Sequence, residues 1–404
     1  MPTATETLPV MPIDTPEFAA DPDPFHQAAM AEHPWLARFT QGYAVHGYDA
    51  NVELLADDEN LIPGLGPIVD FYGMRGTMWG RFMEEMVLSA TGDLHTRLRA
   101  CVAHAFTPRR ANQVRPMMQQ VIGELLDEWA PKGTFDFAEF AAYFPITVMF
   151  GLLGVPPEPV HRIRHAIEGH VATLAIDLAT KPGMLTAWED LWHFADTLIK
   201  QREASGQVDE ESMLDALIVA KQAGQLDEVE LRFMLLTVII AGYDTSKNQL
   251  TWIMKLLVDR PEIYARCAQD KDFCGRVVNE SLRLCGIASP YRAAARDFTY
   301  DGVTFRKGEI VIFATSLAGR DPSVFADPLN FDPDRANASR HVALGRGAHI
   351  CLGQYIAKNQ LQEGIHLICQ RLKNPRITGE VAWRPFIGAW GLKNLPITFD
   401  CTNI

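Results

Sequence analysis

Hydrophobic positions recur at helical spacing over most of the chain, from about Leu94 to Ile218 and again from Asp227 to Asp259. Asp227 followed by Glu230 is typical of a capping box, in which a carboxylate accepts the free backbone N–H groups of the first turn. The second pattern predicts a helix of about 32 residues, which is roughly 48 Å long at 1.5 Å per residue. A helix of that length would cross the whole molecule.

Shorter patterns predict further helices and a small amount of β-structure. A hairpin is expected around Gln41 and Gly42, and Pro261 is expected to end the long helix. The other expected elements are helices over 48–56, 271–284 and 353–372, small β-structure over 298–313 and 376–400, a long loop over 61–80, an irregular meander over 321–340 and an extended arm over the first 25 residues. The fold class is therefore mainly α with minor β near each end. Residues 1–20 are expected to form an N-terminal arm and 21–404 a single domain.

Composition and charge exclude several classes of protein. The formal net charge of −13 and the lack of a basic segment speak against a nucleic-acid binder. Seven widely spaced cysteines without a C-x-x-C pair indicate a reducing compartment with neither a disulfide framework nor a zinc knuckle. The N-terminus lacks the features of a signal peptide, and the most apolar run, Phe233–Gly242, is far shorter than the roughly 20 residues that span a membrane. We expect a soluble, cytoplasmic monomer with no membrane contact.

The segment around Cys351 carries the first candidate chemistry, in the pattern G-x-G-x-H-x-C-x-G. Gly345 and Gly347 permit a tight turn with positive φ, and Cys351 then stands directly before a predicted helix. Backbone N–H groups and the positive end of that helix favour a thiolate. A thiolate stabilised in this way suits a haem iron that activates dioxygen, because thiolate donation favours O–O cleavage.

The second candidate lies in the middle of the long predicted helix, at Ala241-Gly242-Tyr243-Asp244-Thr245. Activation of dioxygen needs space and a route for protons. Gly242 is expected to supply the space, Thr245 to form a hydrogen bond to the oxygen or to a water, and Asp244 to relay protons.

Both segments resemble the motifs of the cytochrome P450 family, namely its haem-ligand signature and its A/G-G-x-D/E-T motif, some 106 residues apart. The resemblance implies the fold of that family, with the long central helix crossing over a haem b whose axial ligand is the Cys351 thiolate. It also implies a monooxygenase that uses O2. This chain has Leu344 where the family usually has Phe, and Lys358 where it often has Arg.

Further positions match the family between and around the two motifs. Glu280 and Arg283 resemble its structural E-x-x-R pair, for which Arg335 would be the partner in the meander. The residues that the resemblance assigns to the haem propionates and their surroundings are His95, Arg99, Arg292 and His341, together with Gly345 and Gly242 beside the cofactor. The resemblance covers about residues 21–395.

The family resemblance also implies which segments line the substrate pocket. The candidates are Phe71, Tyr72, Met78, Trp79, Phe82, Met83, Met86, Thr237, Ile240, Ala241, Ile287, Ala288, Tyr291 and Trp390. As a set they are apolar and rich in methionine, which suits an adaptable pocket for a lipophilic small molecule. Tyr72, Tyr243 and Tyr291 are each candidates for orienting one polar group of that molecule.

Electrons for the reaction would come from NAD(P)H through a ferredoxin reductase and a separate ferredoxin, since no redox domain is fused to the chain. A basic patch on the cysteine side could attract an acidic ferredoxin, with Arg109, Arg110, Arg346 and Lys358 as candidates. Hydroxylation is the main reaction expected and epoxidation the second.

Two alternatives remain open from the sequence alone. A non-catalytic haem-thiolate sensor or binding protein would keep Cys351 but would not need Asp244 and Thr245. An unrelated helical protein with a coincidental cysteine loop would bind no haem and would be colourless.

Overall fold

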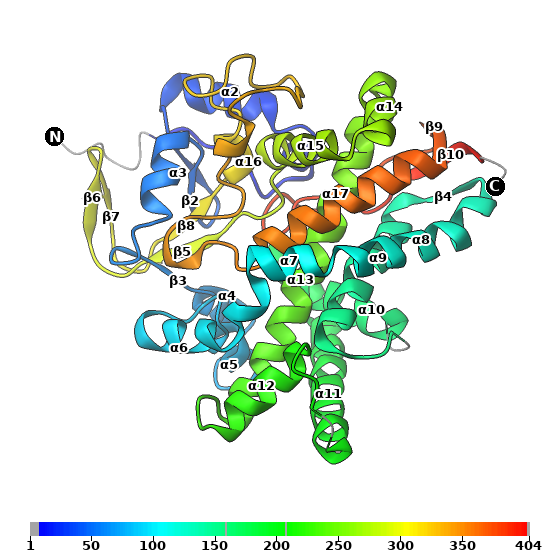
Figure 1. Ribbon diagram of the computed structural model, residues 1–404. Helices are drawn as coiled ribbons and strands as arrows, with labels where there is room; N and C mark the ends of the chain where they lie inside the picture. The colour runs from blue at the N-terminus through cyan, green and yellow to red at the C-terminus, as the bar shows by residue number, and fades with distance from the viewer. Residues whose placement is uncertain (1–7, 158–159, 207, 402–404) are drawn as a thin grey trace.

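The computed structural model describes residues 8–157, 160–206 and 208–401. Its central element is α13 (Glu228–Val258), a helix of 31 residues that runs through the middle of the molecule (Figure 1). The Asp227 side chain accepts from the amides of Val229 and Glu230, and Glu230 closes the capping box. The long central helix predicted from the sequence is therefore confirmed.

Helices surround α13 over most of the chain, as the hydrophobic spacing predicts. Their bounds before α13 are α6 (Gly92–Ala103), α7 (Pro108–Gln113), α8 (Arg115–Trp129), α9 (Phe137–Leu153), α10 (Val160–Val171), α11 (Lys181–Ser205) and α12 (Met213–Gln222). Short 3-10 helices join some of them, at His104–Phe106, Ala130–Lys132, Ala172–Ala175 and Leu178–Thr180. The α9 helix packs along α13 and is buried along most of its length.

The N-terminal prediction is only partly right. The hairpin is present as β1 (Leu36–Phe39) and β2 (Gly42–Val45), and α3 (Tyr48–Leu54) follows it. The extended arm is wrong, because α1 (Pro16–Ala20) and α2 (Asp23–Glu32) form there. Met11, Ile13 and Phe18 are fully buried in the main core, so apolar side chains anchor the described part of this segment. The boundary between an arm at residues 1–20 and a domain at 21–404 stays a prediction.

The predicted long loop over 61–80 is also wrong. It contains β3 (Leu61–Pro63), α4 (Gly66–Phe71) and the start of α5 (Met78–Glu85). The β3 strand forms because it pairs with β5, whose residues lie more than 200 positions later; Leu61 is opposite Ala294. Local periodicity carries no sign of such a partner.

The C-terminal half contains α14 (Pro261–Gln269), α15 (Lys271–Leu284), α16 (Thr315–Ala318) and α17 (Gln354–Arg371). The α14 helix was not predicted, because a proline after a long helical pattern indicates the end of that helix. Proline is also favoured at the first position of a helix, where its missing N–H costs nothing, and Pro261 occupies that position.

Three small sheets complete the fold. The largest has the strand order β1-β2-β8-β5-β3, with β5 at Tyr291–Ala294 and β8 at Ile310–Phe313. The β6–β7 hairpin (Phe298–Tyr300 and Val303–Phe305) projects from it, and a third sheet joins β4 (Thr134–Asp136), β10 (Pro396–Cys401) and β9 (Leu372–Ile377). The mainly α class with minor β-structure is confirmed. No helix in the described ranges is long and apolar enough to cross a membrane.

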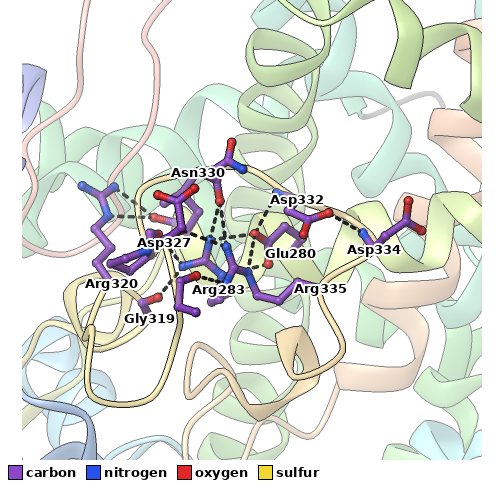
Figure 2. Close-up of polar contacts among 12 residues, drawn as sticks. Glu280, Arg283, Gly319, Arg320, Asp327, Asn330, Asp332, Asp334 and Arg335 are labelled. Atoms are coloured by element: carbon purple, nitrogen blue, oxygen red, sulfur yellow. Dashed lines mark hydrogen bonds and ion pairs between the residues drawn. The ribbon is translucent and has the colours of Figure 1, made fainter.

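The irregular meander is held by one buried ion network (Figure 2). Arg283 binds the carboxylate of Glu280 with two hydrogen bonds, of 2.8 and 2.6 Å, and both side chains are fully buried. The guanidinium also donates to the carbonyls of Gly319, Pro328 and Asn330. Arg335 closes the network by donating to Glu280 at 3.1 Å. The three residues thus lie together, as the resemblance implies, and they tie α15 to a segment without regular structure.

Two buried histidines beside the N-terminal hairpin should make stability depend on pH. The rings of His26 and His46 pack edge to face with centroids 5.3 Å apart. Burial lowers the pKa of His26 to about 3 and that of His46 to about 4, and the two rings, if charged, would also repel each other or neighbouring cations. The unfolded chain therefore binds protons more readily, and stability present near pH 6.5 is lost as the pH falls.

We expect the free energy of unfolding to fall by about 1–2 kcal/mol per histidine between pH 6.5 and pH 5. Urea unfolding at a series of pH values measures this fall. In His46→Phe, the free energy of unfolding should fall less over this pH range, because the contribution of one histidine is gone. The same pH dependence in the variant and the parent would contradict the assignment.

Candidate active site

The loop before α17 has the tight geometry that its glycines predict. Gly345 and Gly347 have φ values of 73° and 66°, in the left-handed region. The Cys351 amide donates to the Leu344 carbonyl at 2.8 Å and closes the turn. Cys351 therefore stands three residues before the first residue of α17, at the positive end of that helix.

Opposing effects act on the pKa of the Cys351 thiol. Burial raises the pKa of the thiol, whereas a hydrogen bond from the Gly353 amide and the positive charges of Arg99 and Lys358 lower it. Burial dominates in the protein alone. A metal ion bound to the sulfur would reverse the balance, because a coordinating thiol loses its proton outright.

Basic side chains converge above this loop. Among the described residues none of them forms an ion pair, and the carboxylate whose charge acts on His95 and Arg292 is that of Asp58. The rings of His95 and His349 pack at a tilt with centroids 4.1 Å apart, and Arg99 donates to the Ile350 carbonyl at 2.7 Å. Burial lowers the pKa of Arg292 to about 10 and that of His349 to about 3. Such a cluster is costly unless an anion compensates it.

Several buried polar atoms of this cluster and of His341, which precedes the cysteine loop, also lack hydrogen-bond partners. Among the described residues, these buried and unpaired atoms include Nε2 of His95, Nε of Arg292 and both ring nitrogens of His341. Buried polar groups are normally paired, so each of these atoms indicates a missing partner. A group with two carboxylates, bound between the cysteine loop and α13, would supply partners of the right charge. His349 is part of the cysteine motif, but the sequence alone gives no role for it.

On α13, Ala241 and Thr245 are one helical turn apart and both side chains face a cavity. The Thr245 hydroxyl donates to the Ala241 carbonyl at 2.9 Å. Asp244 is also at the cavity wall but is almost fully buried, and its carboxylate accepts from Arg384 at 2.7 Å and from Asn248 at 3.1 Å. Arg384 comes from the C-terminal segment, and the sequence analysis did not single it out.

The role predicted for Gly242 is wrong. A Cβ at this position would lie 2.5 Å from the sulfur of Met149 on α9, and Gly242 does not line the cavity. Gly242 allows α13 and α9 to pack closely; the cavity-facing residue of this turn is Ala241.

The cavity itself has a volume of about 290 Å³ and a mostly apolar wall. Of the predicted pocket residues, those that line it are Phe82, Met83, Met86, Thr237, Ile240, Ala241, Ala288 and Tyr291. Gly345, His349 and Arg292 close the side nearest the cysteine loop. The cavity therefore lies between that loop and the Thr245 face of α13.

The other predicted pocket residues lie elsewhere. Phe71 and Met78 are exposed on the surface, and Ile287 is buried in the main core away from the cavity wall. The Trp390 indole donates to the Ala19 carbonyl, and the Tyr72 hydroxyl is bound to Thr180 and to two carbonyls of the segment between α10 and α11.

Two further candidates are held by hydrogen bonds within the protein. Trp79 is buried and donates to His170 at 3.3 Å, and Tyr243 donates to Glu168. Of the three tyrosines considered, Tyr291 alone lines the cavity, and its hydroxyl donates to the Leu174 carbonyl.

The sequence analysis missed the part of the wall that comes from the end of α10 and from a C-terminal turn. These residues are His170, Val171, Leu174, Gly388 and Ala389. Neither segment has a motif, and the chain brings them to the cavity only through tertiary packing. The positive φ of Gly388, at 90°, shows a tight turn there.

Comparison with known proteins agrees with this geometry. The profile of the family described as "Cytochrome P450" matches residues 174–375. Luteothin monooxygenase of Streptomyces thioluteus is 32% identical over 397 residues, which cover 97% of this chain and 96% of that protein.

The chain belongs to the cytochrome P450 family.

Mycinamicin IV hydroxylase/epoxidase of Micromonospora griseorubida is 33% identical over 308 residues, covering 74% of this chain and 76% of that protein. Among solved structures, P450BioI in complex with an acyl carrier protein ligated to hexadec-9Z-enoic acid superposes with a TM-score of 0.84. It is 28% identical and covers 95% of this chain and 100% of that chain. The protein is thus a cytochrome P450 monooxygenase, and its cofactor is haem with a cysteine thiolate ligand.

The residues present fit this cofactor. A haem carries two propionates, and the unpaired atoms of His95, Arg292 and His341 are donors of the kind that carboxylates need. The glycine turn before Cys351 also leaves room beside the site. A Cβ built on Gly345 would contact only the backbone of His349 and Ile350 in the same loop.

Proposed function

We propose that this P450 inserts one atom of O2 into a lipophilic small molecule, with hydroxylation as the main reaction and epoxidation as the second. One observation carries the proposal. A largely apolar cavity is bounded on one side by Thr245 and Asp244 and on the other by the cysteine loop. Reducing equivalents would come from NAD(P)H through a ferredoxin reductase and a ferredoxin.

In this proposal the Cys351 thiolate would bind the haem iron, and His95, Arg99, Arg292, His341 and His349 would hold the propionates. The bound haem supplies the activation of dioxygen, which thiolate donation favours. The protein supplies an apolar site: Met83, Met86 and Ile240 line the cavity, and a substrate that fills it would displace water from the reactive centre.

The acid–alcohol pair moves protons. The Thr245 hydroxyl can exchange its bond to the Ala241 carbonyl for one to a water or to oxygen. Asp244, directly before it in the chain, can deliver a proton only after its carboxylate turns away from Arg384. We therefore propose that Arg384 holds Asp244 in a closed position between turnovers.

Turnover under ¹⁸O2 tests the proposed function. The haem-loaded chain, a ferredoxin, its reductase and NADPH are incubated with lipophilic compounds that shift the spin state of the iron. We expect product with one ¹⁸O atom. Tight binding and reduction without any oxygenated product would instead favour the haem-thiolate sensor.

A second test concerns the ferredoxin. Arg109 is exposed on α7, which packs against α17 on the cysteine side, and Arg346 and Lys358 are partly exposed. Arg110 is a weaker candidate, because its guanidinium is paired with Glu211.

We expect Arg109→Glu to slow reduction by ferredoxin about three- to tenfold at low salt, with a smaller effect at high salt. Stopped-flow reduction of the haem measures it. Lys307→Glu is the matched control, because Lys307 is exposed and follows shortly after β7, which lies apart from α7 in Figure 1. Equal effects in both variants would contradict a docking site at Arg109.

We also propose a cytoplasmic monomer. The described cysteines 101, 267, 274, 285, 351 and 369 are free thiols, which is in keeping with a reducing compartment.

A further inference from the structure

One polar side chain of the cavity wall has a fixed hydrogen-bonding role that neither the haem site nor the acid–alcohol pair uses. His170, at the end of α10, lines the cavity and is 4% exposed. Its Nδ1 accepts from the indole N–H of Trp79 at 3.3 Å. Because an indole nitrogen only donates, the ring nitrogen that faces Trp79 carries no proton.

The rest of the imidazole follows from this bond. Burial lowers the pKa of His170 to about 4, so the ring is neutral at physiological pH and holds a single proton. Since Nδ1 is the acceptor, that proton is on Nε2. Within the described part of the chain Nε2 has no hydrogen-bond acceptor, so its N–H is available to a ligand.

Apart from Arg292 and His349, which are assigned to the propionates, and from Asp244 and Thr245, the other polar groups of the wall do not restrict the ligand in this way. Thr237 and Tyr291 already donate their hydroxyl protons to backbone carbonyls, at 2.7 and 2.5 Å. Ser89 and Ser289 also line the cavity, but a serine hydroxyl serves equally as donor or acceptor. His170 can offer the ligand only a donor.

The position of His170 indicates which part of a ligand it would meet. Phe82 contacts both His170 and Phe233, with ring centroids 5.5 and 5.4 Å apart, so His170 lies near the first half of α13. The cavity wall extends along α13 from Thr237 to Thr245, which is about 12 Å at 1.5 Å per residue. A ligand that is bound to His170 and extends along this wall would reach Thr245 with its other end.

We propose that His170 is a specificity-determining residue whose Nε2–H donates to a carbonyl or ether oxygen of the substrate, at the end remote from the carbon that is oxidised. The substrate class is then a lipophilic ketone, ester or ether, in preference to a plain hydrocarbon. This inference rests on the proposed function, because it takes the cavity as the substrate site.

The test measures binding to the haem-loaded full chain by calorimetry, which needs no turnover. The probes are methyl nonyl ketone and undecane, which differ by one carbonyl oxygen. The measured quantity is the ratio of the dissociation constant for the hydrocarbon to that for the ketone. In His170→Phe this ratio should fall about three- to tenfold, the size expected for one neutral hydrogen bond. In His170→Gln, which keeps a side-chain N–H, it should stay within about twofold of the parent value.

A second variant tests the proton position while keeping the histidine. Trp79→Phe removes the indole donor, so Nδ1 can carry the proton and Nε2 can accept. Undecyl alcohol, which can donate, should then gain affinity relative to the ketone. The reduced carbon monoxide spectrum confirms that each variant holds its haem.

Each outcome has a distinct meaning. An unchanged ketone ratio in His170→Phe would overturn the proposal, and an unchanged preference in Trp79→Phe would overturn the assigned tautomer. Failure of the proposed function would appear elsewhere, as the absence of ¹⁸O in products of the parent protein.

Discussion

Thr245→Ala is expected to uncouple the enzyme, so that electrons from NADPH appear as hydrogen peroxide in place of oxygenated product. The hydroxyl of Thr245 faces the cavity and donates to the Ala241 carbonyl at 2.9 Å. Alanine removes the hydroxyl without changing the helix. Product formed per electron consumed should fall by about tenfold or more, because positioned proton transfer contributes roughly 10²–10⁴ in rate.

Asp244→Asn tests the proton route itself. The amide keeps the size of the side chain and can still accept from Arg384, but it cannot carry a proton. Turnover should slow by about 10²-fold while ligand binding stays unchanged.

Thr245→Ser is the matched control for Thr245→Ala, because serine retains the hydroxyl and should keep most of the coupling between electron consumption and product formation. Unchanged product per electron in Thr245→Ala would contradict the role assigned to this residue.

Arg283→Met is expected to produce the largest loss of stability of any single change considered for this chain. It leaves the carboxylate of Glu280 fully buried without its main partner and frees the carbonyls of Gly319 and Pro328 (Figure 2). Removing one partner of a buried pair costs about 3–5 kcal/mol. Since the network ties the meander to α15, we also expect the variant to lose haem.

Thermal and urea unfolding of the haem-loaded protein measure this loss. Arg266→Met is the matched control, because Arg266 pairs with Asp334 of the same meander but both side chains are about half exposed. That pair should contribute little to stability, because solvent screens it. Equal losses in the two variants would show that the burial of Arg283 is not the cause.

The parts of the fold that the sequence predicted best are those with local signals. Asp227 and Glu230 mark the start of α13, and the glycines at 345 and 347 mark the cysteine turn. In contrast, β3 exists only because Leu61 pairs with Ala294, and the buried N-terminal segment exists because Phe18 finds a core to enter. Such tertiary partners are not visible in local periodicity.

The candidate site shows the same division. Cys351, Asp244 and Thr245 were found because their motifs are short and continuous. Arg384 and His170 were missed because each reaches the site through packing of distant segments. The Gly242 prediction failed for a related reason: its neighbour is Met149 on α9, which no motif includes.

The reduced carbon monoxide difference spectrum of the haem-loaded chain tests the central claim most directly. If Cys351 is the thiolate ligand, the Soret band should show the strong red shift that gives the family its name, and Cys351→His should lose that shift while still binding haem. An unshifted, globin-like band in the folded parent protein would contradict thiolate ligation and the monooxygenase mechanism that depends on it.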